Sequence, residues 1–366
     1  MSSLAVLRAG MLCLGILTIC VIVYSVQPYS LRLIYRREDV GSENFCYNPR
    51  GRSRNVTRTL LFTDGYQNIH ETFETKTALH FERLSPQLCG GYRCRVKTTS
   101  TDSPRGAHMA VFFGPRLRNA PPQKSPCQLW VFASGESQNM LSTNQPQLWN
   151  GVFNYSLTFV RPSLANQHDL SYSRSFSRRS IKLQENYALK KKSMIGTASG
   201  LSKVLWFVSN CHPSGVYKVT SGRAEYTLEL SKYIPIDVFS QSEQCEEQLS
   251  RIHIHKSEKE PSYNNYWFYL SFENSLCKDY ITEKFWKIIT GDSLAIPVVL
   301  GGSGMRDYEA IAPPNSYIDV RNFTSPRHLA QHLKSVAENE DAFNYYHRWR
   351  NEYQLRPHHN CEYVRV

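Results

Sequence analysis

A strand, a helix and a second strand follow one another between residues 266 and 300, and this pattern restricts the fold more than any other part of the chain. Residues 266–272 are an aromatic run that favours a strand. Asp279 is a suitable N-cap for a helix that Gly291 would end, with apolar residues at helical spacing between them. Residues 295–300 predict the next strand. This order predicts a βαβ unit in a parallel sheet.

Polar residues gather where the first strand of this unit ends and its helix begins. Ligands of such sheets bind outside the carboxyl ends of the strands, and the N–H groups that open a helix favour anions. Lys284 lies near the helix start, where a cation is unfavourable unless an anion is bound. Taken alone, Lys284 would be interpreted as a solvated helix lysine, and it is the surrounding motif that favours a functional role. The whole cluster predicts a ligand that carries phosphate. Its members are Glu273, Asn274, Tyr280, Thr282, Glu283 and Lys284.

The same alternation of strands and helices continues on both sides of this unit. In the C-terminal half we expect strands at 204–208, 236–239 and 317–320, and helices at 223–234, from Pro326 with Ser325 as cap, and at 341–349. The preceding part has strand-like runs at 59–63, 109–113 and 128–133 separated by prolines, which favours a further α/β domain. Residues 162–201 are rich in Ser, Lys and Arg and predict a solvated surface loop, with a site for an acidic partner as the alternative.

The block FYLSFENSLCKDYITEKFWKIITGDSLAIPVVLGGSGMRDYE resembles the donor-site signature of the α1,3/α1,4-fucosyltransferases of glycosyltransferase family 10. The likeness covers residues 203–350, with patches before them. It implies a GT-B-like α/β fold with two Rossmann-like domains facing a cleft: an acceptor-side domain at 58–200 and a GDP-fucose-binding domain at 201–366.

The resemblance also implies an enzyme. It would move L-fucose from GDP-β-L-fucose to the 3-hydroxyl of GlcNAc in a glycoprotein or glycolipid glycan, with inversion. Transfer to the N-glycan core or to a protein hydroxyl is the alternative within the family. A catalytically silent glycan- or nucleotide-binding relative is the alternative outside catalysis.

Several donor-site roles follow from the resemblance. Lys284 and Arg223 are expected to bind the diphosphate, and Glu283 the sugar hydroxyls. Ser209 and Asn210 follow the 204–208 strand and are expected to bond phosphate or sugar. The remaining matches are Asn274, Tyr280 and Thr282, although Tyr280 could simply pack against the helix and Glu273 is as well explained by a structural hydrogen bond as by a ligand contact.

The general base is expected in the first domain. Residues 128–137 resemble the family's RWVWxxxES segment, which implies that Glu136 is the base; burial at the end of an apolar strand would raise the pKa of such a carboxyl. The chain departs from the family at Gln138 and at the stretch after Asn154, where only Arg161 remains of a YRRD-type motif. Acceptor selection is therefore expected to differ, with Arg161 on the acceptor side; a difference in donor contacts is the alternative.

The sequence predicts neither a metal nor a redox cofactor. Asp102 and Asp307 are isolated rather than paired as in a DxD motif, and no G-x-G-x-x-G loop for NAD or FAD occurs. The cysteines lack zinc-finger spacing with histidines. We therefore expect that no cofactor is required and that GDP-fucose is the donor substrate.

The net charge of +12 does not indicate nucleic-acid binding, because the basic residues are scattered and no nucleic-acid-binding motif accompanies them. Residues 9–26 carry no charge and predict a transmembrane signal anchor, with 1–8 as cytoplasmic tail and 27–57 as stem; a cleavable signal peptide is the alternative. Counting the positive residues on either side of this segment favours an N-terminus outside the cytoplasm, which is opposite to the orientation of a signal anchor with a cytoplasmic tail. The N-glycosylation acceptors Asn55, Asn154 and Asn322, with the resemblance, imply a single-pass type II Golgi membrane protein with a lumenal catalytic domain.

Eight of the ten cysteines lie outside the apolar segment, an even number that is compatible with disulfides in an oxidising compartment. Cys89 and Cys94 could close a small loop. Buried free thiols are the alternative for Cys211 and Cys277.

Overall fold

The computed structural model describes residues 57–63, 93–99, 107–117, 120–125, 128–140, 145–161, 169–171, 176–188, 190, 204–214, 218–256 and 261–355. Their contacts divide them into two compact units. The first holds the described residues up to Glu136 and those from 145 to 171, and the second holds 137–140 and everything described from 176 onward. Each unit contains a six-stranded sheet, in which all the strands are parallel.

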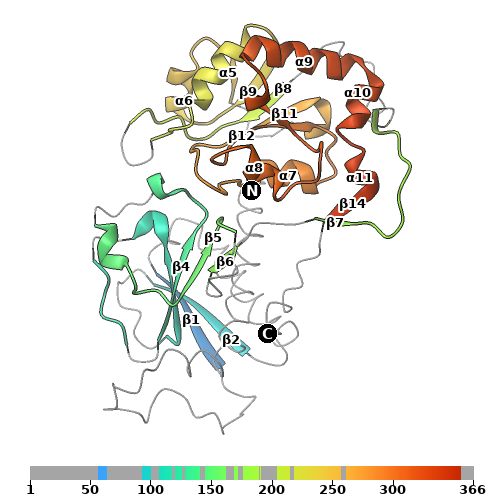
Figure 1. Ribbon diagram of the computed structural model, residues 1–366. Helices are drawn as coiled ribbons and strands as arrows, with labels where there is room; N and C mark the ends of the chain where they lie inside the picture. The colour runs from blue at the N-terminus through green and yellow to red at the C-terminus, as the bar shows by residue number, and fades with distance from the viewer. Residues whose placement is uncertain are drawn as a thin grey trace. The chain divides into compact units, whose positions relative to one another are not determined.

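The sheet of the first unit has the strand order β2-β1-β3-β4-β5-β6 (Figure 1). Its strands are β1 (Thr57–Thr63), β2 (Arg93–Thr99), β3 (Met109–Phe113), β4 (Leu129–Ser134), β5 (Tyr155–Thr158) and β6 (Asp169–Ser171). Aromatic rings pack against it, with the centroids of Phe112 and Trp130 4.6 Å apart and Trp149 stacked on Phe153. The three strands predicted for this region are confirmed as β1, β3 and β4, whereas β2, β5 and β6 were not predicted.

The sheet of the second unit has the order β10-β9-β8-β11-β12-β13. Since β8 is the first of these strands in the chain, this is the 3-2-1-4-5-6 order of a Rossmann-type sheet. The strands are β8 (Val204–Phe207), β9 (Ile236–Phe239), β10 (Ile254–His255), β11 (Phe268–Phe272), β12 (Ile296–Leu300) and β13 (Ile318–Asp319). A separate antiparallel pair joins β7 (Phe176–Arg178) to β14 (Tyr353–Leu355).

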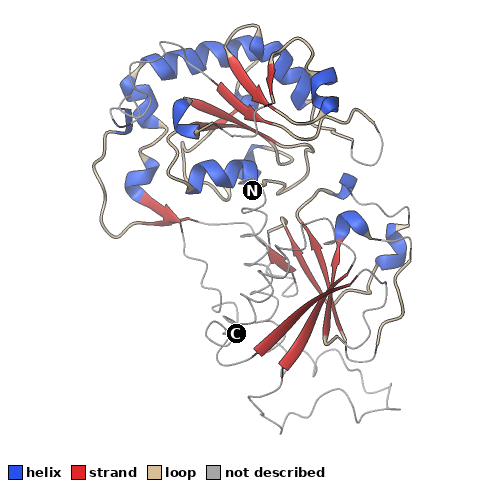
Figure 2. Ribbon diagram, turned by 180° about the vertical axis from the view of Figure 1, so that it is seen from behind, coloured by secondary structure: helices blue, strands red, loops and turns tan. Residues whose placement is uncertain are grey.

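Helices cover both faces of the second sheet (Figure 2). One face packs with Leu270 and Phe272 against Leu230 and Leu333, and the other packs Val299 against Phe285. The alternation along each strand thus supplies two apolar layers. The helices are α5 (Arg223–Ser231), α6 (Glu243–Gln248), α7 (Glu283–Thr290), α8 (Met305–Glu309), α9 (Pro326–Glu338), α10 (Glu340–Tyr345) and α11 (Trp349–Glu352).

Two helix predictions are corrected by the structure. The helix after β11 begins at Glu283 with Thr282 as N-cap, not at Asp279. Asp279 has φ 62°, and its N–H donates to Asp307 Oδ2 at 3.1 Å, so it lies in a tight turn that precedes the helix. The helix expected at 341–349 is divided into α10 and α11 by a turn. The Ser325 cap is confirmed, because its side chain accepts from the His328 N–H.

The region expected as a solvated loop at 162–201 is partly packed on the second unit. Strand β7 pairs with β14, and the side chains of Tyr187 and Ala188 are buried. Residues 180–186 are exposed, as predicted. The second unit therefore includes residues that precede 201.

Cys211 and Cys245 form a disulfide that joins the loop after β8 to α6, whereas Cys277 is a partly exposed free thiol. Cys89, Asn55 and the apolar segment 9–26 lie outside the described residues, whereas Cys94 belongs to β2. Among the helices in the described ranges, none is both long and apolar enough to cross a membrane.

Candidate functional site

The candidate site lies at the carboxyl ends of the two central strands of the second sheet. β8 and β11 are neighbours, and the chain continues from β8 toward one edge of the sheet and from β11 toward the other. Ligands of doubly wound sheets bind where the strand order reverses in this way. Ser209 and Asn210 follow β8, and Glu273 and Asn274 follow β11, so the sequence-predicted residues of these two loops come together at the switch point.

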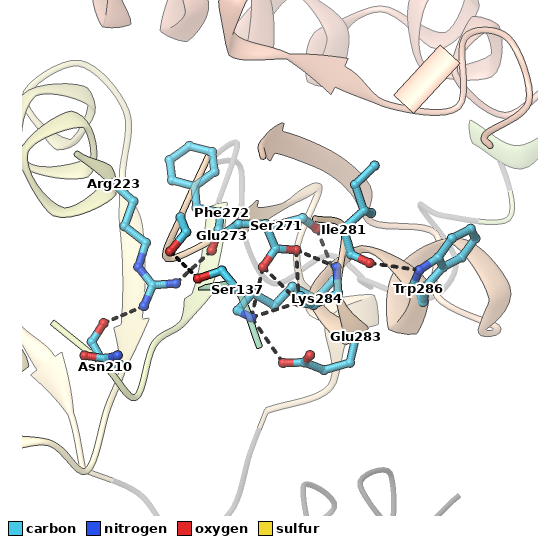
Figure 3. Close-up of polar contacts among 12 residues, drawn as sticks. Ser137, Asn210, Arg223, Ser271, Phe272, Glu273, Ile281, Glu283, Lys284 and Trp286 are labelled. Carbon is cyan, nitrogen blue, oxygen red and sulfur yellow. Dashed lines mark hydrogen bonds and ion pairs between the residues drawn. The ribbon is translucent and has the colours of Figure 1, made fainter. Parts of the chain in front are cut away.

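Arg223 joins the ends of these two strands (Figure 3). Its Nη1 donates to the carbonyl of Phe272 at 2.9 Å, and its Nη2 donates to the carbonyl of Asn210. The residue is 2% exposed and is the first residue of α5, after Gly222 in the left-handed conformation at φ 69°. Arg223 therefore lies at the predicted donor site. Two of its donors bind backbone carbonyls and so connect the loops after β8 and β11.

Glu273 is fully buried at the end of β11 and organises the start of α7. Its Oε1 accepts from the Thr282 N–H at 2.7 Å and from the Thr282 hydroxyl at 2.9 Å. Its Oε2 lies 2.9 Å from the same hydroxyl and 3.2 Å from Lys284 Nζ. The N–H of the N-cap residue Thr282 thus already has a carboxylate of the protein as its partner.

Lys284 is the cation of the cluster. Its Nζ donates to Thr282 Oγ1 at 2.9 Å and forms ion pairs with Glu273 Oε2 and Glu283 Oε1, both at 3.2 Å. The Lys284 side chain is 19% exposed and that of Glu283 is 38% exposed. The ammonium therefore lies between one carboxylate that is sealed in the protein and one that reaches solvent.

The two carboxyl groups titrate in opposite directions. Burial raises the pKa of Glu273, with a smaller contribution from the charge of Glu283, and the charge of Lys284 and the bonds from Thr282 oppose this rise. Burial also acts to raise the pKa of Glu283, but the charge of Lys284 and several hydrogen bonds outweigh it and lower that pKa to about 2. Glu283 is accordingly the carboxylate that remains ionised at all ordinary pH values.

The loop between β12 and α8 supports the site, a role that was not predicted from the sequence. Asp307 Oδ2 accepts from the N–H of Ser303 at 2.7 Å, from its hydroxyl at 3.1 Å, and from the N–H of Asp279 at 3.1 Å. This carboxylate ties the β12–α8 loop to the turn before α7. In the sequence, the GGSG stretch at 301–304 followed by Asp307 was the signal that could have identified this loop.

The other predicted residues of the second unit differ in exposure. Ser209 is exposed, and Asn274 is buried with no hydrogen-bond partner for its Oδ1 among the described residues. Tyr280 is 1% exposed, which favours the packing interpretation for its ring. A short segment, 137–140, also belongs to this unit, and Ser137 Oγ donates to Ser275 Oγ at 2.9 Å.

The predicted residues of the first unit follow its strands. Glu136 lies two residues after β4 and Arg161 three residues after β5, and both are half-buried. The Oδ1 of Asn154 accepts from Lys124 Nζ at 2.7 Å and from the Trp130 N–H at 2.8 Å, so this sequon asparagine also links β4 to the start of β5. In the second unit, Asn322 is exposed.

No group of three or more His, Cys, Asp or Glu side chains in the described ranges is arranged to hold a metal ion.

Comparison with known proteins identifies the family. The family model described as "Glycosyltransferase family 10 (fucosyltransferase) C-term" matches residues 198–365. The chain is 30% identical over 328 residues to "Alpha-(1,3)-fucosyltransferase C" of Drosophila melanogaster, covering 82% of this chain and 70% of that protein. It is 30% identical over 283 residues to "3-galactosyl-N-acetylglucosaminide 4-alpha-L-fucosyltransferase FUT3" of Bos taurus, covering 75% and 68%.

Among solved structures, "Crystal Structure of alpha1,3-Fucosyltransferase with GDP-fucose" matches with a TM-score of 0.49 and 16% identity over 82% of this chain and 84% of that one. The sequence relatives decide the family without it, since one of them is 30% identical and 70% covered. The chain belongs to the fucosyltransferases of glycosyltransferase family 10.

Proposed function

We propose that this enzyme transfers L-fucose from GDP-β-L-fucose to the 3-hydroxyl of GlcNAc in glycoprotein or glycolipid glycans, with inversion to an α1,3 linkage. The observation that carries the proposal is Lys284, held between Glu273 and Glu283 at the switch point of the second sheet. A cation at this edge suits a nucleotide diphosphate, and the family supplies fucose as the transferred sugar.

In the proposed reaction, the bond between fucose and the diphosphate breaks as the acceptor oxygen attacks the opposite face of the sugar. Negative charge grows on the leaving diphosphate, and Lys284 stabilises it at the moment when it develops. Glu283 is ionised and partly exposed beside Lys284, so its oxygens are available to sugar hydroxyls. Arg223 contributes to donor binding by fixing the positions of the loops after β8 and β11 relative to each other.

Glu136 is the proposed general base that takes the proton of the acceptor hydroxyl. It lies two residues after β4 and is half-buried, so part of its side chain is open to a substrate. Ser209, Asn210, Asn274 and Thr282 complete the proposed donor site, and Arg161 is assigned to the acceptor side. The ring of Tyr280 is buried and is assigned to packing. The reaction requires no metal, because the single displacement needs one base and fixed cations.

We further propose that the enzyme is a type II Golgi membrane protein whose catalytic units face the lumen. The support is the uncharged segment 9–26 and the sequons at Asn55, Asn154 and Asn322. The Cys211–Cys245 disulfide fits an oxidising compartment.

The decisive experiment incubates the full chain with labelled GDP-fucose, other sugar nucleotides and a panel of glycan and protein acceptors, followed by linkage mapping. We expect transfer from GDP-fucose alone and an α1,3 product on GlcNAc. A product on the 4-hydroxyl, the N-glycan core or a protein side chain would replace the proposed acceptor while leaving the donor intact.

The base is tested separately. Glu136→Gln should bind GDP as the parent does, while turnover falls by at least ~100-fold, because general base catalysis typically contributes this much. Turnover equal to that of the parent would remove Glu136 from the mechanism.

A further inference from the structure

We propose that Glu273 is a positioning residue of the donor site: its carboxylate fixes Lys284 and the N-cap of α7 in the arrangement that receives the diphosphate. The inference rests on the proposed function of Lys284 and extends it to a residue with no exposed surface. Because Glu273 is sealed from the site, it acts through Lys284 and Thr282 and not by touching the donor.

The contacts of Glu273 connect it with Thr282 and Lys284 in one hydrogen-bond network. Both carboxylate oxygens lie within hydrogen-bond distance of Thr282 Oγ1, Oε1 also accepts from the Thr282 N–H, and Oε2 pairs with Lys284 Nζ. Lys284 Nζ in turn donates to Thr282 Oγ1 at 2.9 Å. The three side chains therefore restrain one another, and a charge-assisted network of this kind fixes the ammonium more tightly than a single ion pair.

The backbone around Glu273 leaves its carboxylate little freedom to move. Its N–H donates to the carbonyl of Leu300 at 2.8 Å, so the sheet holds its main chain. Behind the side chain, a Cβ added at Gly301 would lie 2.7 Å from Glu273 Cγ. The absence of a side chain at Gly301 is what allows the carboxylate to lie against the backbone and point at α7.

The two carboxylates that hold Lys284 have different parts to play. Glu273 is buried and fixed, whereas Glu283 is 38% exposed and lies on the same helix as Lys284. A diphosphate can therefore replace Glu283 as a partner of Lys284 while Glu273 retains its hold on the ammonium. On this basis the charge of Glu283 opposes diphosphate binding and that of Glu273 prepares it.

Glutamine cannot replace Glu273 in this network, although it has the same shape. The Thr282 N–H contacts Oε1 and Lys284 Nζ contacts Oε2, so the one carbonyl oxygen of glutamine can stand at only one of these positions, and its NH₂ group cannot accept at the other. Glu273→Gln must therefore lose one side of the arrangement, whichever way the amide turns.

A double-mutant cycle on GDP affinity tests the inference, using the full chain and calorimetry with GDP. Glu273→Gln is combined with Lys284→Met, which removes the ammonium and keeps the apolar stem. We expect Glu273→Gln alone to weaken GDP binding by about 10-fold or more, as the loss of a hydrogen bond to a charged group implies. In the Lys284→Met background the same change should cost less than about 2-fold, because contacting residues that act as a unit are not additive.

Glu283→Gln is the matched control, since it removes the other carboxylate on the same ammonium. It should raise GDP affinity, because the charge of Glu283 competes with the diphosphate for Lys284. A reduction equal to that caused by Glu273→Gln would overturn the separate role of Glu273, as would full additivity in the cycle. A Lys284→Met protein that binds GDP as tightly as the parent would instead remove the diphosphate assignment of the proposed function, and the inference with it.

A second variant keeps the test valid if Glu273→Gln does not fold. Thr282→Val removes the hydroxyl that bridges Glu273 and Lys284 but leaves the buried ion pair and the Thr282 N–H bond. It should weaken GDP binding in the parent and have little effect in the Lys284→Met background. Equal effects in both backgrounds would overturn the inference.

Discussion

At the scale of single residues, Arg223 shows how a buried cation can serve a site without lying open to it. Its fork of donors spans the carbonyls of Phe272 and Asn210, at the ends of β11 and β8. Lysine has one ammonium and cannot make both contacts in this geometry. Arg223→Lys should therefore lower the free energy of unfolding of the second unit by about 2 kcal/mol and weaken GDP binding. Urea unfolding and calorimetry measure the two effects.

The exposed Arg306 provides the control for this prediction, because Arg306→Lys changes the same chemistry on the surface. It should alter the free energy of unfolding by less than about 0.5 kcal/mol. If Arg223→Lys behaves in the same way as the control, the carbonyl contacts of Arg223 contribute nothing to stability.

The opposite pKa shifts of Glu273 and Glu283 predict opposite pH dependences of stability. Burial raises the folded-state pKa of Glu273, with a contribution from the charge of Glu283 and against the opposing charge of Lys284. The contribution of Glu273 to stability is therefore present below its ordinary pKa and is lost as pH rises through the raised value. The pKa of Glu283 is lowered from 4.5 to about 2, so its contribution is present above 4.5 and is lost as pH falls toward 2.

Unfolding of the parent, Glu273→Gln and Glu283→Gln across a pH series measures this. The stability advantage of the parent over Glu273→Gln should shrink toward high pH, and its advantage over Glu283→Gln should shrink toward low pH. Parallel curves for the two variants would contradict both shifts.

The sequence predicted the exposed half of the site better than the buried half. Lys284 and Glu283 are adjacent at a helix start, so local pattern was enough to find them. Glu273 and Asp307 depend on partners at Thr282 and Asp279, which the fold brings to them from other parts of the chain. Hydrogen bonds of this kind depend on how loops cross, and no local propensity encodes them.

At the scale of elements, the loop between β12 and α8 depends on Gly301 because of what lies beside it. A Cβ at Gly301 would lie 2.6 Å from Tyr308 Oη and 2.7 Å from Glu273 Cγ, whereas one at Gly304 would meet nothing within 4 Å. Gly301→Ala should destabilise the protein by about 1–3 kcal/mol and weaken GDP binding, since the neighbouring side chains must move. Gly304→Ala in the same loop should change neither, and thermal unfolding with GDP titration compares the pair. Equal behaviour would show that Glu273 has room to shift.

Elements with strong periodicity were predicted, and short polar ones were not. β9 and β3 were predicted with their observed bounds, and α9 with its cap, because apolar spacing and capping residues are local signals. The N-cap of α7 was predicted at Asp279, three residues before the observed N-cap Thr282. Asp279 resembles an N-cap in the sequence, but its N–H donates to Asp307, which lies beyond β12. The apolar spacing between 341 and 349 continues through the turn that separates α10 from α11, so spacing alone could not reveal the break.

At the scale of the whole molecule, the chain builds two parallel sheets with different strand orders. The βαβ pattern predicted that the second sheet is parallel, but the order of its strands is set by packing between distant segments. That order is what makes the ends of β8 and β11 neighbours and so creates the site. The first sheet was harder to predict, because its strands β2, β5 and β6 lack a continuous apolar run.

This division into two units predicts where a nucleotide will stabilise the protein. If GDP is held by Lys284 and the loops after β8 and β11, the second unit alone contains the primary binding residues. At a GDP concentration of about 100 times the dissociation constant, binding adds about 2.7 kcal/mol to the stability of the unit that holds it. Hydrogen exchange followed by mass spectrometry should therefore show slower exchange in peptides that cover residues 208–210, 220–223 and 273–284, and little change in β3 and β4. Lys284→Met at the same GDP concentration should abolish the slowing, whereas protection confined to the first unit would place the nucleotide on the other sheet and remove the site argued for at the switch point.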